Sequence, residues 1–262
     1  MIGALMVGTS IKDAYAAEAV AHNVHAFATG ILALDGNMPA CTVEYGCINL
    51  ERHRVSIPLP TYNSTLSVIG ATRPPKYCGI KRHTLMYSAA NRFFVIMPFV
   101  LNLTGRYSQL LKIDHDVSIL RVPPMPLPAF DLLHTGLTSE SEACAIHLNE
   151  WYQQYAHTSS QLPKWVVYGN FLILNSTFVE RYKSFAYAWY QDAESWKYRW
   201  TDQQFWSSAI QYFNATVVDC SSWRMNRVFT HNREGKQHIR RFRQHDRTHL
   251  PCRFYEDLIE RS

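Results

Sequence analysis

Apolar residues near the start of the chain change from a continuous run to a helical spacing. Residues 2–7 (Ile-Gly-Ala-Leu-Met-Val) form the run, and the Ala-rich segment 14–27 has the helical spacing. This order predicts a strand, a loop and a helix. Between residues 36 and 77 five prolines separate short β-like runs, so we expect many loops in this segment.

The middle of the chain predicts a helix and then a buried strand. Apolar side chains recur at helical spacing before Pro98, and a proline in that place is expected to end the helix. Residues 107–113 follow as a continuous strand-like run, and several prolines then predict irregular structure. The residues of the helical stripe are Met86, Ala90, Phe93, Phe94 and Met97.

The second half of the chain predicts three helices around one strand. Residues 165–174 are expected to form the strand, and a helix is expected to begin at Asp202. The aromatic residues of these helices favour core packing over contact with a ligand. The predicted helix faces consist of Leu148, Trp151, Tyr152 and Tyr155, of Phe178, Tyr182, Phe185 and Trp189, and of Trp206, Ile210 and Phe213.

Strands that alternate with helices predict an α/β fold with a mainly parallel central sheet flanked by helices on both faces. A chain of 262 residues, 47% hydrophobic and 18% charged, is long enough for one substantial core. We expect a single catalytic domain over residues 1–236, with a nucleotide-binding part over about 1–120, an acceptor-side part over about 121–236, and a basic tail over 237–262.

Charge and apolar length restrict the partners. The formal net charge is +5, and much of the excess lies between residues 227 and 247, a segment that attracts phosphates. A solvated tail and a nucleic-acid-binding segment both remain open. No run reaches the roughly 18 apolar residues of a membrane span, so the chain as written is expected to be soluble, with any membrane anchor upstream of it.

Cysteines and glycosylation sequons leave the compartment open. The six cysteines contain no C-x-x-C pair, which argues against a structural zinc site and a thioredoxin-like motif. An even number permits disulfides without showing them. Acceptor sequons for N-glycosylation, relevant in the secretory pathway, begin at Asn63, Asn102, Asn175 and Asn214.

The acidic triplet Asp114-His115-Asp116 follows the predicted strand directly. In extended backbone alternate side chains point the same way, so both carboxylates can face one point. Ligands of open α/β sheets bind at the carboxyl ends of strands, and oxygen ligands favour Mg²⁺ or Mn²⁺. The triplet therefore predicts a divalent metal site, where the ion would neutralise charge on a departing diphosphate.

Several short motifs together resemble the glycogenin-like transferases, which have the GT-A fold. Asp114-His115-Asp116 resembles their metal-binding D-x-D, and Tyr168-Gly169-Asn170-Phe171 stands where they have a sugar-facing strand. The segment 83–117, with Met86 and Arg92-Phe93, is similar to fungal Golgi mannosyltransferases. The two remaining motifs are Asp13-Ala14-Tyr15-Ala16 after the first strand and Asp202-Gln203-Gln204, which resembles D-Q-D.

The resemblance implies a metal-dependent glycosyltransferase that uses Mn²⁺ or Mg²⁺, a UDP- or GDP-linked sugar and a glycan or protein acceptor. His231 and Lys236 lie in a segment whose spacing departs from the H-x-x-G-x-x-K of these enzymes, and His245 and His249 are rival metal ligands. The resemblance implies Thr9, Tyr15, Asp114 and Lys236 as nucleotide-binding, Asp114, Asp116 and His231 as metal-binding, and Asn170, Asp202 and Gln203 as catalytic residues.

Several alternatives stay open at this point. Asp202 either caps a helix or acts on the sugar, as a base or by orienting it, and His231 is either a ligand or a surface histidine. An inactive protein that binds sugars or nucleotide sugars on the same fold is a second possible function. A protein that binds nucleic acid is a third, although we do not expect nucleic acid to be a partner. We expect the Golgi or ER lumen, or the cytoplasm if the chain is complete.

Overall fold

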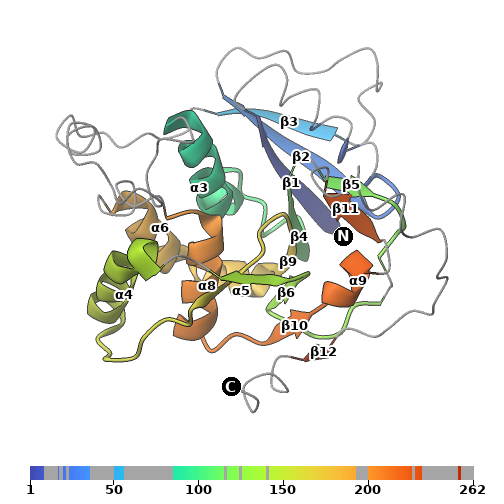
Figure 1. Cartoon of the computed structure of the whole chain (residues 1–262). Coiled ribbons are helices and arrows are strands. Elements are labelled where there is room, and N and C mark those ends of the chain that lie inside the picture. Colours follow the sequence, from blue (N-terminus) through green and yellow to red (C-terminus); the bar gives the residue numbers. More distant parts are fainter. Residues whose placement is uncertain are drawn as a thin grey trace.

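The computed structural model shows a mixed α/β fold with one large sheet (Figure 1). It describes residues 1–8, 17, 20–21, 24–35, 50–55, 85–114, 117–123, 126–139, 142–192, 200–225, 228–231 and 253–254. Thr9, Tyr15, Asp116 and Lys236, to which the sequence assigns binding roles, lie outside the described residues, as do His245 and His249.

Strands and helices alternate along most of the described chain. The strands are β1 (Ile2–Gly8), β2 (Ala28–Asp35), β3 (Leu50–Val55), β4 (Gln109–Ile113), β5 (Val117–Ile119), β6 (Leu132–His134), β7 (Leu137–Ser139), β8 (Trp165–Val167), β9 (Phe171–Asn175), β10 (Val217–Asp219), β11 (Phe229–His231) and β12 (Arg253–Phe254). The helices are α3 (Leu85–Val100), α4 (Glu142–Ala156), α5 (Ser176–Arg181), α6 (Lys183–Gln191), α8 (Asp202–Tyr212) and α9 (Ser221–Met225), and residues 17, 20, 21 and 24 are also helical.

The main sheet has eight strands in the order β12-β10-β6-β9-β4-β1-β2-β3. β1 pairs in parallel with β2 and β4, and β2–β3 and β6–β10 are parallel as well. β9 runs antiparallel between β4 and β6, and β12 is antiparallel to β10. The mainly parallel sheet expected from the sequence is thus confirmed.

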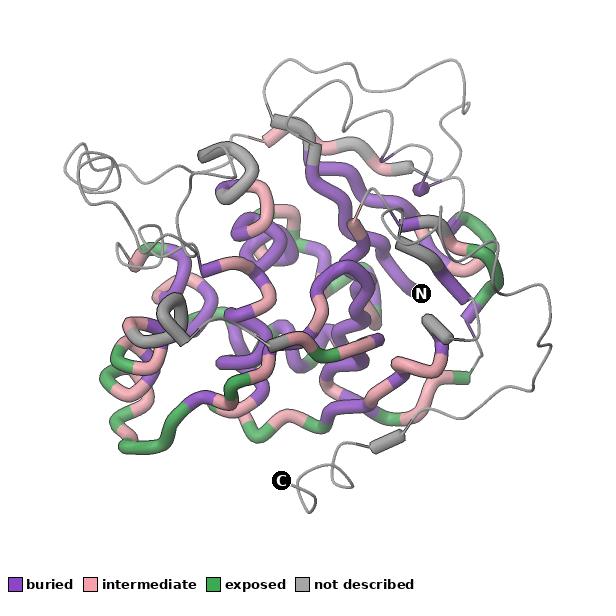
Figure 2. Tube along the Cα trace, viewed as in Figure 1, coloured by how far each residue is buried: buried purple, intermediate pink, exposed green. Residues whose placement is uncertain are grey.

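Helices cover both faces of this sheet, because alternate strand residues bury to opposite sides. On one side, the α3 face, Leu110, Leu132 and Leu172 pack with α3, α4, α6 and α8. On the other, the α9 face, Leu111, Leu133 and Phe171 pack with α9 and the helical residues at 17–24. Figure 2 shows the central strands of the sheet, β1, β4, β6 and β9, as mostly buried.

The strand directions bring several predicted site residues to one edge of the sheet. β4, β6 and β10 run the same way, so their carboxyl ends lie together, and the antiparallel β9 begins at that same edge. The backbone N–H of Asp114 donates to the carbonyl oxygen of Asn170 at 3.0 Å, which continues the β4–β9 pairing by one residue. Asp114 and Asn170 are therefore neighbours although 56 residues separate them.

The strand expected over residues 165–174 is wrong. The chain turns at Gly169-Asn170, so that β8 pairs with β7 in a small separate sheet while β9 enters the main one. The apolar residues on either side of Gly169-Asn170 are compatible with one buried strand or with two, and a Gly-Asn pair is a turn signal that favours two. The turn delivers Gly169 and Asn170 to the edge described above.

Two helix boundaries also differ from expectation. Pro98 lies inside α3, which continues to Val100. A proline in the last turn removes only its own N–H, and Leu101 still donates to the carbonyl of Met97 at 3.0 Å. The aromatic face from Phe178 to Trp189 is divided at Tyr182 into α5 and α6, and its side chains bury in the core as expected.

The ends of the described chain add two facts. Within the expected basic tail, Arg253 and Phe254 form β12, which pairs with Asp219 and Val218 of β10. None of the helices in the described ranges is long and apolar enough to cross a membrane.

Candidate active site

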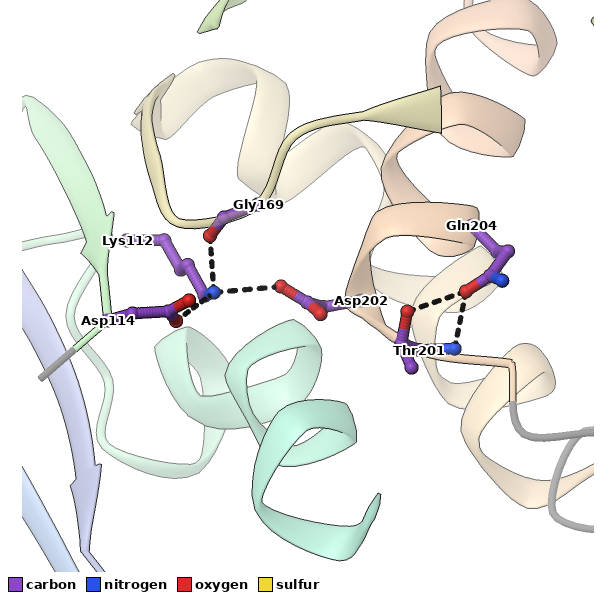
Figure 3. A network of polar contacts seen from close by, with 6 residues as sticks. All are labelled: Lys112, Asp114, Gly169, Thr201, Asp202 and Gln204. Atoms are coloured by element: carbon purple, nitrogen blue, oxygen red, sulfur yellow. Dashed lines mark hydrogen bonds and ion pairs between the residues drawn. The ribbon is translucent and has the colours of Figure 1, made fainter. Parts of the chain in front are cut away.

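A buried lysine occupies the centre of the polar cluster at the carboxyl edge of the sheet. Lys112 belongs to β4 and points to the α3 face, where its ammonium lies 4.8 Å from the centre of the Phe94 ring. Its side chain is 2% exposed. Nζ lies 2.5 Å from Oδ1 of Asp114 and 3.2 Å from Oδ2 of Asp202, and it also donates to the carbonyl oxygen of Gly169 (Figure 3).

The same contacts join three separate parts of the chain. Asp114 follows β4, Gly169 lies in the turn between β8 and β9, and Asp202 is the first residue of α8 (Figure 3). A charged amine inside a protein is stable only when it is paired and hydrogen-bonded. Lys112 therefore fixes the strand end, the turn and the helix start relative to one another.

The carboxylate of Asp202 is held in place by this lysine, and the cap of α8 is formed by its neighbours. Thr201 is the N-cap, and Oε1 of Gln204 accepts from both the backbone N–H and the hydroxyl of Thr201 at 2.6 Å. The first of these bonds satisfies a backbone donor at the start of the helix, as in a capping box. The helix start expected at Asp202 is confirmed, and the Asp202 carboxylate is directed to Lys112 (Figure 3).

Gly169 allows α8 to approach the turn closely. A Cβ atom at this position would lie 2.9 Å from Oδ2 of Asp202 and 3.0 Å from Cγ of Gln203. Both distances are shorter than ordinary van der Waals contact. The missing side chain thus lets the first turn of α8, with Asp202 and Gln203, lie directly against the backbone of residue 169.

The pKa values reflect a balance between burial and charge. Burial raises the pKa of the Asp202 carboxyl group and Asp114 raises it further, while the Lys112 ammonium opposes both. Burial alone would lower the pKa of Lys112, but the carboxylates of Asp114 and Asp202 outweigh it and raise that pKa above its ordinary value. Lys112 therefore remains an ammonium ion between two carboxylates.

Asn170 carries unused hydrogen-bonding capacity at the same edge. The residue is 2% exposed, and neither Oδ1 nor Nδ2 of its side chain has a hydrogen-bond partner among the residues that the structure describes. An unpaired buried amide costs free energy, so natural proteins rarely keep one. The amide is thus the polar group at this edge whose hydrogen-bonding capacity the described residues leave unused.

A second polar pair lies two strands away on the same face. His134 ends β6, is fully buried, and its Nδ1 accepts from the backbone N–H of Gly136 at 3.2 Å, while Oδ1 of Asp219 is 3.8 Å away. Burial lowers the pKa of His134 more than Asp219 and the Gly136 contact raise it. The imidazole is therefore neutral, and Nε2 carries its proton.

Arg92 of α3 holds the backbone that leads into α8. Its buried guanidinium donates to the carbonyl oxygens of Trp189 at 3.1 Å, Tyr190 at 2.9 Å and Trp200 at 3.3 Å, and it stacks 4.3 Å from the centre of the Trp189 ring. One side chain thus joins the end of α6 to the residue that precedes the cap of α8.

Backbone pairing brings His231 close to the acidic triplet. β11 is antiparallel to β5, and His231 is opposite Val117, the residue after Asp116. Two aspartates and a histidine are a suitable donor set for Mn²⁺, so the residues present fit the metal implied by the resemblance. Among the described residues, no group of three His, Cys, Asp or Glu side chains forms a metal cluster.

Lys112 is the site residue that sequence reasoning missed. A lysine within the apolar run Leu110-Leu111-Lys112-Ile113 is unusual, because lysine is rarely buried without a charged partner. This rarity was the signal that could have identified it. Of the predicted catalytic residues, the structure brings Asn170, Asp202 and Gln203 to the same edge as Asp114.

Comparisons with known proteins give matches only at the level of structure. No family model matches the sequence, and no curated protein matches it. Core-mannan synthase A from Aspergillus fumigatus, in its Mn/GDP form, is similar with a TM-score of 0.56 and 11% identity over 79% of this chain and 69% of the other.

The mannosyltransferase Ktr4p from S. cerevisiae is similar with a TM-score of 0.53 and 10% identity, over 79% of this chain and 65% of the yeast chain. Its complex with GDP has the same TM-score and 11% identity. This chain thus spans about two thirds of the length of the two transferases. It has the fold of the GT-A glycosyltransferases.

Proposed function

We propose that this chain is a glycosyltransferase that moves a sugar from a nucleotide-sugar donor to an acceptor hydroxyl. The observation that carries the proposal is the buried Lys112, which holds Asp114 and Asp202 together at the carboxyl edge of a mainly parallel sheet. In open α/β sheets this edge is where ligands bind. The fold, shared with mannosyltransferases, supports the same reading.

We assign Asp114, Asp116 and His231 to a Mn²⁺ or Mg²⁺ ion. The pairing of His231 with Val117 supports this set, and the Aspergillus structure was solved in a Mn/GDP form. When bound, the metal would neutralise negative charge on the diphosphate leaving group. Thr9, Tyr15 and Lys236 are proposed to contact the nucleotide, together with Asp114.

The remaining residues act on the sugars. The unpaired amide of Asn170 offers both a donor and an acceptor to a sugar hydroxyl. Asp202 presents a fixed carboxylate beside it, and Gln203 packs against the same turn. Groups held by a rigid helix and strand preserve the reacting geometry without reordering, which is how positioning accelerates a transfer.

Two observations support a lumenal setting. Cys220 is disulfide-bonded, and disulfides persist mainly in oxidising compartments. The sequon residues Asn102 and Asn214 are exposed, and both have positive φ, which is typical of turns. We therefore propose the Golgi or ER lumen.

The deciding experiment is calorimetric titration with GDP and with UDP, each with and without Mn²⁺. The intact chain is compared with Asp116→Ala and with Glu150→Ala, a control on α4 whose side chain is 58% exposed. We expect one nucleotide to bind only with Mn²⁺, binding to disappear in Asp116→Ala, and Glu150→Ala to bind like the intact chain.

Transfer itself is tested by release of the nucleoside diphosphate from GDP-mannose and a panel of UDP-sugars, with simple sugar acceptors. Metal-dependent binding without release under any condition would instead support an inactive nucleotide-sugar binder. If neither nucleotide binds to the folded chain, the proposed function is wrong, and salt-dependent binding of nucleic acid becomes the next test.

A further inference from the structure

The disulfide of Cys220 has a partner that strand pairing identifies. Cys220 directly follows β10, is fully buried and is disulfide-bonded. Its backbone N–H donates to the carbonyl oxygen of His134 at 2.8 Å, which holds it against the end of β6. The other half of the bond must come from one of the five remaining cysteines.

The register between β10 and β12 points to one of them. In this antiparallel pair Val218 is opposite Phe254, and Asp219 is opposite Arg253. Position 252, a cysteine, lies just outside the described residues, and the same register extended by one residue would set it opposite Cys220. Opposed residues in antiparallel strands have Cα atoms about 4.5–5.5 Å apart, within the range of about 4.4–6.8 Å that disulfides require.

Of the two cysteines between β2 and β3, one is too far away along the sheet. β10 and β3 are separated by six strand spacings, or about 29 Å, while Cys47 lies three residues before β3 and can reach only about 10 Å from it. Cys41 follows β2 by six residues, which reach about 21 Å. With the further distance of about 4.4–6.8 Å that a disulfide spans, this matches the five spacings, about 24 Å, between β2 and β10, so distance does not exclude Cys41.

Another cysteine lies on the wrong side of the sheet. Cys144 belongs to α4, which packs by Leu148 and Tyr152 on the α3 face. Cys220 packs on the α9 face with Trp223. Since the sheet separates the two faces, α4 cannot supply the partner, and Cys41 and Cys78 are left as the rivals that distance alone does not eliminate.

We infer that Cys220 and Cys252 form a disulfide that closes residues 221–251 into a loop anchored on β10. Its formation removes two protons and two electrons from the thiols, and a thiol–disulfide oxidoreductase accepts them by reduction of its own disulfide to a dithiol. The closed loop contains His231 and Lys236, so on the proposed function the bond tethers a metal ligand and a diphosphate-binding residue to the active edge.

The pairing is tested without any assay of activity, by tryptic mapping of the protein secreted from eukaryotic cells. Free thiols are alkylated under denaturing conditions, glycans are removed enzymatically, and the digest is analysed without reduction. We expect the peptide Trp200–Arg224, which contains Cys220, to be linked to Thr248–Arg253, which contains Cys252. Linkage of Cys220 to any other cysteine, or an alkylated Cys220, overturns the inference.

Variants provide an independent readout. Cys252→Ser should leave Cys220 open to alkylation in the denatured protein, whereas the matched change Cys78→Ser should leave it protected. The reverse pattern would assign the bond to Cys78 and overturn the inference.

The consequence for the site is tested separately, because it rests on the proposed function. If the Cys220 bond maps as expected and the intact chain binds a nucleotide with Mn²⁺, Cys252→Ser should weaken that binding at least tenfold. An unchanged affinity would refute the tethering role while leaving the mapped bond and the proposed function intact.

Discussion

Replacement of Lys112 by methionine tests the centre of the candidate site. Methionine keeps most of the length of the side chain but removes the ammonium, so the carboxylates of Asp114 and Asp202 lose the cation that lies 2.5 and 3.2 Å from them. The carbonyl oxygen of Gly169 loses its donor as well. We expect a large loss of stability.

The exposure of the two carboxylates determines the magnitude. The side chain of Asp114 is 32% exposed, so water replaces much of what its lysine contact provides, and this pair contributes at most about 1 kcal/mol. Asp202 is 3% exposed, and removal of one member of a buried pair costs roughly 3–5 kcal/mol. For a chain of this size, the loss corresponds to a fall in Tm of roughly 6–20 °C.

Urea unfolding followed by tryptophan fluorescence measures this loss, because Trp189, Trp200 and Trp206 are all buried. Lys112→Met combined with Asp202→Asn removes both buried charges and should recover most of the stability. Lys183→Met, at an exposed position of α6, is the matched control and should change it by less than about 1 kcal/mol. A loss below about 1 kcal/mol for Lys112→Met, or no recovery in the double variant, would refute the reasoning.

Three further substitutions test other parts of the site. Gly169→Ala forces a Cβ atom to within 2.9 Å of a carboxylate oxygen, so it should lower the stability by about 1–3 kcal/mol and weaken nucleotide binding in calorimetry. The control Gly136→Ala, where the nearest contact of the new Cβ atom is at 3.9 Å, should change neither quantity. Equal effects of the two substitutions would contradict this account. Arg92→Met leaves three backbone carbonyls without their donor and should cost roughly 3–5 kcal/mol in urea unfolding, against less than about 1 kcal/mol for the exposed Arg106→Met. Burial lowers the pKa of His134 below its ordinary value of 6.5, so between the two pKa values the unfolded chain binds a proton that the folded chain does not. The stability should therefore be full above pH 6.5 and fall as the pH decreases below it. His134→Gln should flatten the plot of stability against pH below 6.5, and an unchanged slope would show that another group is responsible.

Periodicity identified the elements that carry a one-sided apolar pattern. β1, the C-terminal part of α4 and the start of α8 were all predicted, because each buries one face or a whole strand in the core. The acidic triplet after β4 was placed at a strand end for the same reason. Patterns of this kind report which residues are buried, and they determine a fold class when strands and helices alternate.

The same patterns carry no information on strand order or on the contacts of single polar residues. The apolar spacing of residues 165–174 is compatible with one strand as well as with two. The pairing of β8 with β7 and of β9 with β4 shows that there are two strands. Lys112 was predicted only as part of a core strand. Its role depends on Asp202, 90 residues later in the chain, and such long-range pairs follow from topology.

The contacts of Arg92 have a consequence for sequence variation. Because the guanidinium holds the carbonyls of Trp189 and Tyr190 at one end and of Trp200 at the other, the position of Asp202 depends on those anchors. Changes that remove this guanidinium are therefore expected to be as rare among related chains as changes in the active site itself.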